Sequence, residues 1–397
     1  MGCVIKTRTP SRSPADSVSP RRTLSESLMS RTRFYSLLTL ASLGAGGLVA
    51  CERKQEPVVA PGVEAEAPKP RAPKPLTPDQ LAHFFRPVPP AKDAKPAPKD
   101  TPSQVELGRM LFFEPRLSKN HDVSCNTCHG LGTYGVDNKA LSDGHKGLKG
   151  ARNSPTVYNA AGHIAQFWDG RADTLEAQAT GPILNPVEMA MPDARRVVST
   201  LSSMPEYVAR FREAFPGAKK PVSLENAAKA LAAFERGLTT TSRFDRFVAG
   251  DSTALTETEQ RGLQLFANTG CTTCHNGPTV GGLSFQRLGL VEDYPGLKDA
   301  GRFDVTKNED DRGKFRVPTL LNVERTGPYL HDGSVSDLPT MVRLMARHQL
   351  ARTLTDAEVD DLVAFLKSLT GELPPAERIA APALPPSTKK TPKPDPS

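Results

Sequence analysis

A cysteine pair followed directly by a histidine occurs twice in this chain of 397 residues. In such a motif the two thiols bond covalently to the edge of a porphyrin, and the adjacent imidazole ligates the iron of a c-type haem. A zinc ribbon would need two cysteine pairs about 15–20 residues apart that share one metal. Here 143 residues (271 − 128) separate the pairs, and each pair has its own histidine. The sequence therefore predicts two covalent haems, one bound through Cys125, Cys128 and His129 and the other through Cys271, Cys274 and His275.

The first 50 residues have the features of an export signal. Two arginines precede an apolar run that ends in Leu48-Val-Ala-Cys51. The run is too short and too rich in glycine for a membrane span, whereas its last four residues resemble a bacterial lipobox. We expect residues 1–50 to be a leader, with cleavage before Cys51 and acylation of its thiol as the only attachment to a membrane. The alternative is an ordinary signal peptide with an incidental cysteine, and Met1 and Met29 are alternative starts.

The flanks of the chain differ in composition from its centre. The formal net charge is +7, but the excess of basic residues lies in the terminal segments, and residues 101–373 alone are weakly acidic. A nucleic-acid partner is therefore not expected. Residues 51–100 are rich in proline and predict an extended tether. Within it, His83-Phe-Phe85 is either a local docking patch or an unstructured stretch, and we favour the unstructured stretch. Residues 374–397 are equally rich in proline, and we expect them to be disordered.

The central part of the chain is predicted to be mostly α. Apolar residues recur at helical spacing in residues 103–113, which lead to the first haem motif, and in residues 223–238. Capping boxes at Thr256 and Thr355 predict two further helices. Residues 130–200 favour loops and short helices, and no stretch alternates as a strand does.

From these patterns we expect two cytochrome c-like haem domains, at residues 101–250 and 251–373. The occupant of the second axial position decides what each haem does: methionine suits electron transfer, and an open position allows a small molecule to react. Spacing alone does not choose among the candidates, which are His121, His145, His163, His331, His348, Met110, Met189, Met191, Met204, Met341 and Met345.

Several stretches of this central part resemble the bacterial dihaem cytochrome c peroxidases. The resemblance extends over about residues 101–373 in unbroken order. It implies an enzyme that reduces hydrogen peroxide to water with electrons from a small periplasmic donor, a cytochrome c or a cupredoxin. It also implies a periplasmic homodimer. The stretches are Leu111-Phe-Phe-Glu-Pro-Arg-Leu-Ser118, Arg152-Asn-Ser-Pro-Thr156, Gln166-Phe-Trp-Asp-Gly-Arg-Ala172, Gly181-Pro-Ile-Leu-Asn-Pro-Val-Glu-Met189, Gly281-Gly-Leu-Ser-Phe285, Val317-Pro-Thr-Leu320 and Tyr329-Leu-His-Asp-Gly333.

The resemblance assigns different roles to the two haems. The N-terminal haem is the peroxide site, and His145 corresponds to the histidine that blocks its iron in the resting oxidised state. The C-terminal haem transfers electrons, and Met345 corresponds to its axial methionine. Met341 lies one helical turn away on the same face and is the alternative ligand. Reduction of the C-terminal haem would then release His145 and open the N-terminal iron.

Three further residues match positions near the reacting centre of the family. Glu188 matches the catalytic glutamate, which would move a proton between the two oxygens of peroxide. Gln178 matches the glutamine that accompanies it. Trp168, the only tryptophan of the chain, matches a residue between the two haems. Without the resemblance, Glu188 would be read as an exposed loop residue and Trp168 as a core aromatic residue.

The resemblance also implies a calcium ion between the domains. Asn153 would supply its side chain, and Thr326 and Pro328 their backbone carbonyls, to a site of oxygen ligands. His331 matches a histidine near the electron-transfer haem, and we do not expect it to bind iron.

Two other functions remain open at this stage. One is an electron carrier in which both haem irons stay closed, which gives Glu188 no role. The other is a dihaem enzyme that uses peroxide to oxidise side chains of a partner protein. In that branch of the family a tyrosine replaces the axial methionine, and the presence of Met345 argues against it.

Overall fold

The computed structural model describes residues 76–88 and 99–397. The expected leader, Cys51 and most of the tether lie outside these residues. Within the described ranges, no helix is both long enough and apolar enough to cross a membrane.

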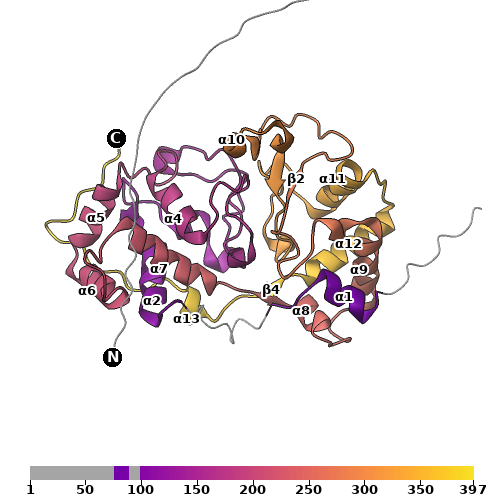
Figure 1. Ribbon diagram of the computed structural model, residues 1–397, viewed down its shortest axis with the longest axis horizontal. Helices are drawn as coiled ribbons and strands as arrows, with labels where there is room; N and C mark the ends of the chain where they lie inside the picture. The colour runs from indigo at the N-terminus through magenta and orange to yellow at the C-terminus, as the bar shows by residue number, and fades with distance from the viewer. Residues whose placement is uncertain (1–75, 89–98) are drawn as a thin grey trace, which may run out of the picture. The chain divides into compact units, whose positions relative to one another are not determined.

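The prediction of a mostly helical chain is confirmed (Figure 1). The described strands are short and form two antiparallel pairs, β1 with β4 and β2 with β3. The helices are α1 (Pro78–Phe84), α2 (Pro102–Phe112), α3 (Cys125–Cys128), α4 (Leu175–Leu184), α5 (Ala194–Ser202), α6 (Pro205–Ala214), α7 (Leu224–Arg236), α8 (Arg243–Val248), α9 (Glu257–Thr269), α10 (Phe303–Thr306), α11 (Leu338–Leu350), α12 (Asp356–Ser368) and α13 (Ala376–Ile379), and the strands are β1 (Thr241–Ser242), β2 (Phe285–Arg287), β3 (Lys314–Arg316) and β4 (Gly371–Glu372).

A close crossing of α2 and α7 organises the N-terminal half. A Cβ atom at Gly108 would lie 1.9 Å from the carbonyl oxygen of Ala230, so only glycine lets the two backbones approach this far. One turn further along each helix, the rings of Phe112 and Phe234 pack edge to face with centroids 5.5 Å apart. The helices begin at the capping residues Thr101 and Ser223.

The C-terminal half repeats this arrangement with α9 and α12. A Cβ atom at Gly262 would lie 1.9 Å from the carbonyl oxygen of Asp361, and the rings of Phe266 and Phe365 follow one turn later, 5.2 Å apart. The capping boxes expected at the starts of these two helices are present. Each half therefore has its own hydrophobic core, and in each half two helices cross closely at a glycine.

A buried polar cluster connects the two halves. The hydroxyl of Thr240 accepts hydrogen bonds from the side-chain amides of Asn159 and Asn322, both at 2.9 Å. All three residues are buried, and both asparagines adopt the left-handed backbone conformation that this residue type tolerates. Asn159 and Asn322 end the matching stretches Pro155-Thr-Val-Tyr-Asn159 and Pro318-Thr-Leu-Leu-Asn322, so the cluster joins equivalent positions of the two halves.

The expectation of an unstructured stretch around His83 is wrong. Residues 78–84 form α1, with a capping box at Thr77. Phe85 follows it and is buried in the C-terminal core, where its ring packs edge to face on Phe244. The proline count of the segment predicted an extended chain, but two adjacent phenylalanines give this part enough apolar surface to dock.

The expected disorder of residues 374–397 is also not what the structure shows. After α13 this segment runs over the N-terminal half, past α6 and α5 (Figure 1). Arg109 donates a hydrogen bond to the carbonyl oxygen of Ala380, and Arg116 donates one to the hydroxyl of Ser387. Leu384 packs against the N-terminal core. Extended proline-rich backbone leaves its carbonyl oxygens free to accept bonds from another surface, and arginines supply the donors here.

Candidate active site

Each cysteine–histidine motif lies in the wall of its own cavity. Cys125, Cys128 and His129 line the N-terminal cavity, and the matching residues Cys271, Cys274 and His275 line the C-terminal cavity. No disulfide joins any of the four cysteines, and burial raises the pKa of each thiol. The thiols are thus available for thioether bonds to a porphyrin in a largely apolar cavity.

The two motif histidines have the protonation state that iron ligation requires. Burial lowers the pKa of His275 to about 4 and lowers the pKa of His129 as well, so both imidazoles are neutral at neutral pH. Nδ1 of His129 lies 3.3 Å from the carbonyl oxygen of Gly135, which leaves Nε2 for a metal. Gly281 makes room beside His275, because a Cβ atom there would lie 2.2 Å from the carbonyl oxygen of Pro318.

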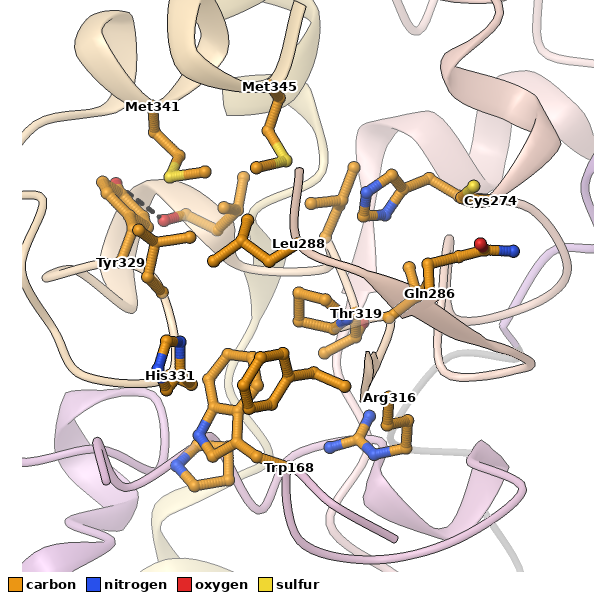
Figure 2. A pocket seen from close by; sticks show the side chains of 18 of the residues that line it. Trp168, Cys274, Gln286, Leu288, Arg316, Thr319, Tyr329, His331, Met341 and Met345 are labelled. Atoms are coloured by element: carbon orange, nitrogen blue, oxygen red, sulfur yellow. Dashed lines mark hydrogen bonds between the residues drawn. The ribbon is translucent and has the colours of Figure 1, made fainter. Parts of the chain in front are cut away.

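Two methionines enter the C-terminal cavity from α11. Figure 2 shows the side chains of Met341 and Met345 reaching into the cavity side by side from this helix. They are four residues apart and therefore lie on one helical face. Both thioethers are available as an axial ligand.

His331 also lines the C-terminal cavity, at some distance from the methionines (Figure 2). Its ring is stacked on the ring of Phe315 with the centroids 4.3 Å apart, and its Nε2 lies 3.9 Å from Oδ2 of Asp299. Burial lowers its pKa. Stacking and burial account for this histidine without an iron.

Several polar side chains line one part of the N-terminal cavity. Helix α4 turns Gln178 and Pro182 toward it, four residues apart on one face, and Asn185 follows at the C-terminal end of the helix. Glu188 lines the same cavity from the next loop. The structure thus brings Gln178 and Glu188 together on the cavity that carries the first haem motif.

Glu188 is held in place and is not a free loop residue. The side-chain amide of Asn185 donates a hydrogen bond of 2.6 Å to Oε1 of Glu188. Desolvation raises the pKa of Glu188, although this hydrogen bond and the charge of Arg171 oppose the shift. A carboxyl group held at this position can accept a proton and give it back.

His145 does not line either cavity in the structure. Its imidazole is buried, and Nε2 lies 3.2 Å from an oxygen of Ser397. Its backbone N–H donates to the carbonyl oxygens of Val187, at 3.1 Å, and Glu188, at 2.8 Å. A Cβ atom at Gly144 would lie 2.0 Å from the carbonyl oxygen of Val187, so the His145 loop is packed directly on the Glu188 loop.

Trp168 lines both cavities. Its indole N–H donates a hydrogen bond of 2.9 Å to the carbonyl oxygen of Asn153. This bond fixes the ring in the wall between the cavities.

The three residues expected at a calcium site all line the C-terminal cavity. The side-chain NH₂ of Asn153 donates to the carbonyl oxygens of Lys139 and Ala140, which turns its oxygen away from them. The peptide bond before Pro328 is cis. Among the described residues no cluster of histidine, cysteine or acidic side chains suits a metal ion, so a cation here would depend on Asn153, carbonyl oxygens and water.

Sequence reasoning did not single out two buried charged residues. Glu235 lines the N-terminal cavity from α7, and burial raises its pKa to about 8. A sequence signal existed, because Glu235 follows Ala228 and Leu231 at the spacing of the apolar face of the helix. Arg316 lines both cavities from β3 and is buried. Nothing in its local sequence distinguishes it from a surface arginine.

Two helical domains, each with a covalent haem motif on its own cavity, define a dihaem cytochrome of c type. The family model described as "Di-haem cytochrome c peroxidase" matches residues 102–253, and the one described as "Cytochrome c" matches residues 259–370. The chain belongs to the dihaem cytochrome c peroxidase family and is an enzyme of the peroxidase class.

Known relatives match the chain over most of its length. It is 47% identical to the cytochrome c551 peroxidase of Pseudomonas aeruginosa over 80% of this chain and 92% of the relative. It is 46% identical to the cytochrome c551 peroxidase of Nitrosomonas europaea, over 78% and 91%. A solved MauG-like protein associated with microbial copper homeostasis is 30% identical, with a TM-score of 0.64, over 75% of this chain and 96% of that one.

Proposed function

We propose that this enzyme reduces hydrogen peroxide to two molecules of water at the N-terminal haem, with two electrons that pass through the C-terminal haem. The position of Glu188 carries the proposal: a carboxyl group of raised pKa lies on the cavity of one haem motif, and no counterpart of it lines the other cavity. The haem iron would supply the site that binds and reduces peroxide. Bound through Cys125, Cys128 and His129, the haem would share its cavity with this carboxyl group.

The role of Glu188 is to move one proton. It takes a proton from the first peroxide oxygen and returns it to the second, which leaves as water. Asn185 holds Oε1 of Glu188 and thereby fixes where the proton is taken up. Gln178, on the same cavity, orients the peroxide by hydrogen bonding. Two further protons from solvent complete the second water.

Access to the N-terminal haem is controlled by His145. In the fully oxidised enzyme this histidine would close the N-terminal haem site, and it would move away once the C-terminal haem is reduced. The hydrogen bonds from the His145 backbone to the Val187 and Glu188 carbonyls support this role, because a shift of the His145 loop also moves the loop of the catalytic carboxyl group.

Cys271, Cys274 and His275 would hold the C-terminal haem, with Met345 as its second ligand, and this haem would supply the site at which electrons enter. The donor is a small protein, a cytochrome c or a cupredoxin, and Trp168 connects the two haem sites. The enzyme functions in the periplasm as a homodimer, attached to a membrane through a lipid on Cys51. A calcium ion at Asn153, Thr326 and Pro328 braces the wall between the cavities.

The function is tested with the holoprotein. Peroxide consumption is measured with reduced cytochrome c as donor, first on fully oxidised enzyme and then after half-reduction with ascorbate, with calcium present. Turnover only after half-reduction supports both the peroxidase and the His145 block. Turnover in both states retains the peroxidase and rejects the block. No turnover in either state, with both irons closed to ligands, would identify an electron carrier instead.

Replacing Glu188 by Gln keeps the shape of the side chain and removes the proton acceptor. We expect kcat to fall roughly 10²- to 10⁴-fold, the range of general acid–base catalysis, with both haem spectra unchanged. Glu213→Gln is the matched control, because Glu213 is an exposed glutamate on α6. Undiminished turnover in Glu188→Gln would remove the carboxyl group from the mechanism.

A further inference from the structure

The two haem cavities are separated by a shared wall. Figure 2 shows Trp168 and Arg316 close together at the end of the C-terminal cavity opposite Met341 and Met345. The wall consists of the residues that line both cavities, which are Asn153, Pro155, Thr156, His163, Trp168 and Arg316. Among them, only Arg316 has a formal positive charge at neutral pH.

Arg316 is buried without a carboxylate partner. Arg316 is only 3% exposed, and its Nη1 has no hydrogen-bond partner. Its Nε contacts the carbonyl oxygen of Phe167 at 3.4 Å, and its backbone N–H donates to the carbonyl oxygen of Trp168 at 2.7 Å. Burial lowers the pKa of Arg316 to about 10, so the group remains charged at neutral pH.

Other arginines of low exposure in this structure hold a carboxylate. Arg116 binds Glu114, Arg152 binds Asp169 and Arg236 binds Asp100, each at 2.6 Å. An unpaired buried cation is unfavourable because desolvation costs several kcal/mol. These three guanidinium groups are each paired with a carboxylate, whereas Arg316 lies beside the two cavities without one.

His163 is the other titratable residue of the shared wall, and it adds no charge there. Its ring lies against Gly282, where a Cβ atom would be 2.3 Å from Cδ2 of the histidine, and neither ring nitrogen has a hydrogen-bond partner. Burial and the charge of Arg316 keep its pKa well below the ordinary value, so it is neutral. Arg316 is therefore the single charge in the shared wall.

We propose that Arg316 is a carboxylate-binding site shared by both cavities, where its guanidinium pairs with propionate groups of both haems. Each haem carries two propionate carboxylates, and the planar guanidinium can bind two carboxylates through separate N–H groups. This pairing explains why an arginine, and not an apolar side chain, occupies the buried wall. It relies on haem in both cavities and not on the peroxidase reaction.

The shared cation has a consequence for the redox chemistry. A positive charge stabilises the reduced form of a haem, because reduction lowers the charge of the iron. One guanidinium between the cavities acts on both haems in the same direction. Arg316 thus raises both reduction potentials together, as a positioning and electrostatic residue that touches neither iron.

The test is a spectroelectrochemical titration of both haems in the wild type and in Arg316→Gln. We expect the equilibrium constant for reduction of each haem to fall about tenfold, a shift of about 59 mV to lower potential for a one-electron couple. Arg302→Gln is the matched control: Arg302 is also partly buried, stacks on Phe285 and donates to the carbonyl oxygen of Asp169, but it lines neither cavity. The control should leave both potentials unchanged.

A fall in both potentials in Arg316→Gln, absent from the control, supports the shared site. A fall in one haem alone, or in neither, overturns it. If Arg316→Gln yields no holoprotein, Arg316→Lys keeps the charge and removes the planar fork. Resonance Raman propionate bending modes of both haems should then shift while the potentials stay near those of the wild type. Unshifted modes would equally overturn the proposal, and none of these readings depends on turnover.

Discussion

The two cavities are built on the same helix crossing but are lined by different chemistry. The C-terminal cavity receives two thioethers, Met341 and Met345, and no carboxyl group, whereas the N-terminal cavity receives Gln178, Glu188 and Glu235. Methionine ligation suits a haem that exchanges electrons, and a carboxyl group of raised pKa suits a haem that handles protons. One fold, used twice in this chain, is therefore specialised through the loops and helix faces that line each cavity.

Removing Met345, the proposed axial ligand, should have the largest effect on the difference between the two haem sites. Met345→Ala should abolish the near-infrared absorption that reports methionine ligation in the oxidised protein and lower the potential of the C-terminal haem. Since each 59 mV is tenfold in the equilibrium constant for reduction, we expect turnover to fall by roughly two orders of magnitude. Met341→Ala is the control on the same helix face. If Met341→Ala loses the band and Met345→Ala retains it, the ligand assignment is reversed.

If His145 closes the N-terminal site, removing it should leave that site open in every redox state. His145→Gly should turn over peroxide without prior reduction, at a rate within about tenfold of the half-reduced wild type. The measurement compares initial rates of the oxidised and half-reduced enzymes. A variant that still requires reduction would show that another group closes the iron.

Calcium removal would test the wall that separates the cavities. Chelation, or Asn153→Ala, should lower turnover by about tenfold, because a reacting geometry that is displaced by about 1 Å loses catalytic efficiency. Added calcium should restore the chelated wild type but not the variant. Equal rates with and without calcium would leave Asn153 as a structural residue that binds Lys139 and Ala140.

The smallest expected effect concerns Glu235 and the stability of the N-terminal half. Its folded-state pKa of about 8 lies above the ordinary glutamate value. The stability that protonated Glu235 contributes is therefore fully present below about pH 4.5 and is lost as the pH rises to about 8. Above about pH 8 the free energy of unfolding no longer changes through this group. Glu235→Gln should raise the melting temperature relative to the wild type by a few degrees at pH 8.5 and by less at pH 5.5. If the difference in melting temperature between Glu235→Gln and the wild type is the same at both pH values, Glu235 is already ionised in the folded protein at pH 5.5.

Much of the fold could be predicted because its signals are local. Capping boxes at Thr256 and Thr355 mark helix starts through contacts only three residues apart, and the structure has helices there. The haem motifs are equally local, since five consecutive residues contain all the attachment chemistry. The family pattern added Gln178 and Glu188, and the structure places both on one cavity.

The parts that could not be predicted depend on distant contacts. Leu384 packs against the N-terminal core and Ala380 binds Arg109, so the final segment is held by partners about 270 residues away along the chain. Composition alone could not indicate those partners. Arg316 is unusual only because two cavities meet beside it, and the orientation of His145 depends on the position of Ser397.

The cluster of Asn159, Thr240 and Asn322 has a consequence for the rate at which electrons move. Electron tunnelling slows steeply as the separation of donor and acceptor grows, so a dihaem enzyme needs a constant spacing between its irons. One hydroxyl that accepts a hydrogen bond from each half, in a place closed to water, resists any twist of one half against the other. If the loops around the N-terminal site rearrange on reduction, this cluster would keep the spacing of the two haem sites, and with it the tunnelling rate, unchanged.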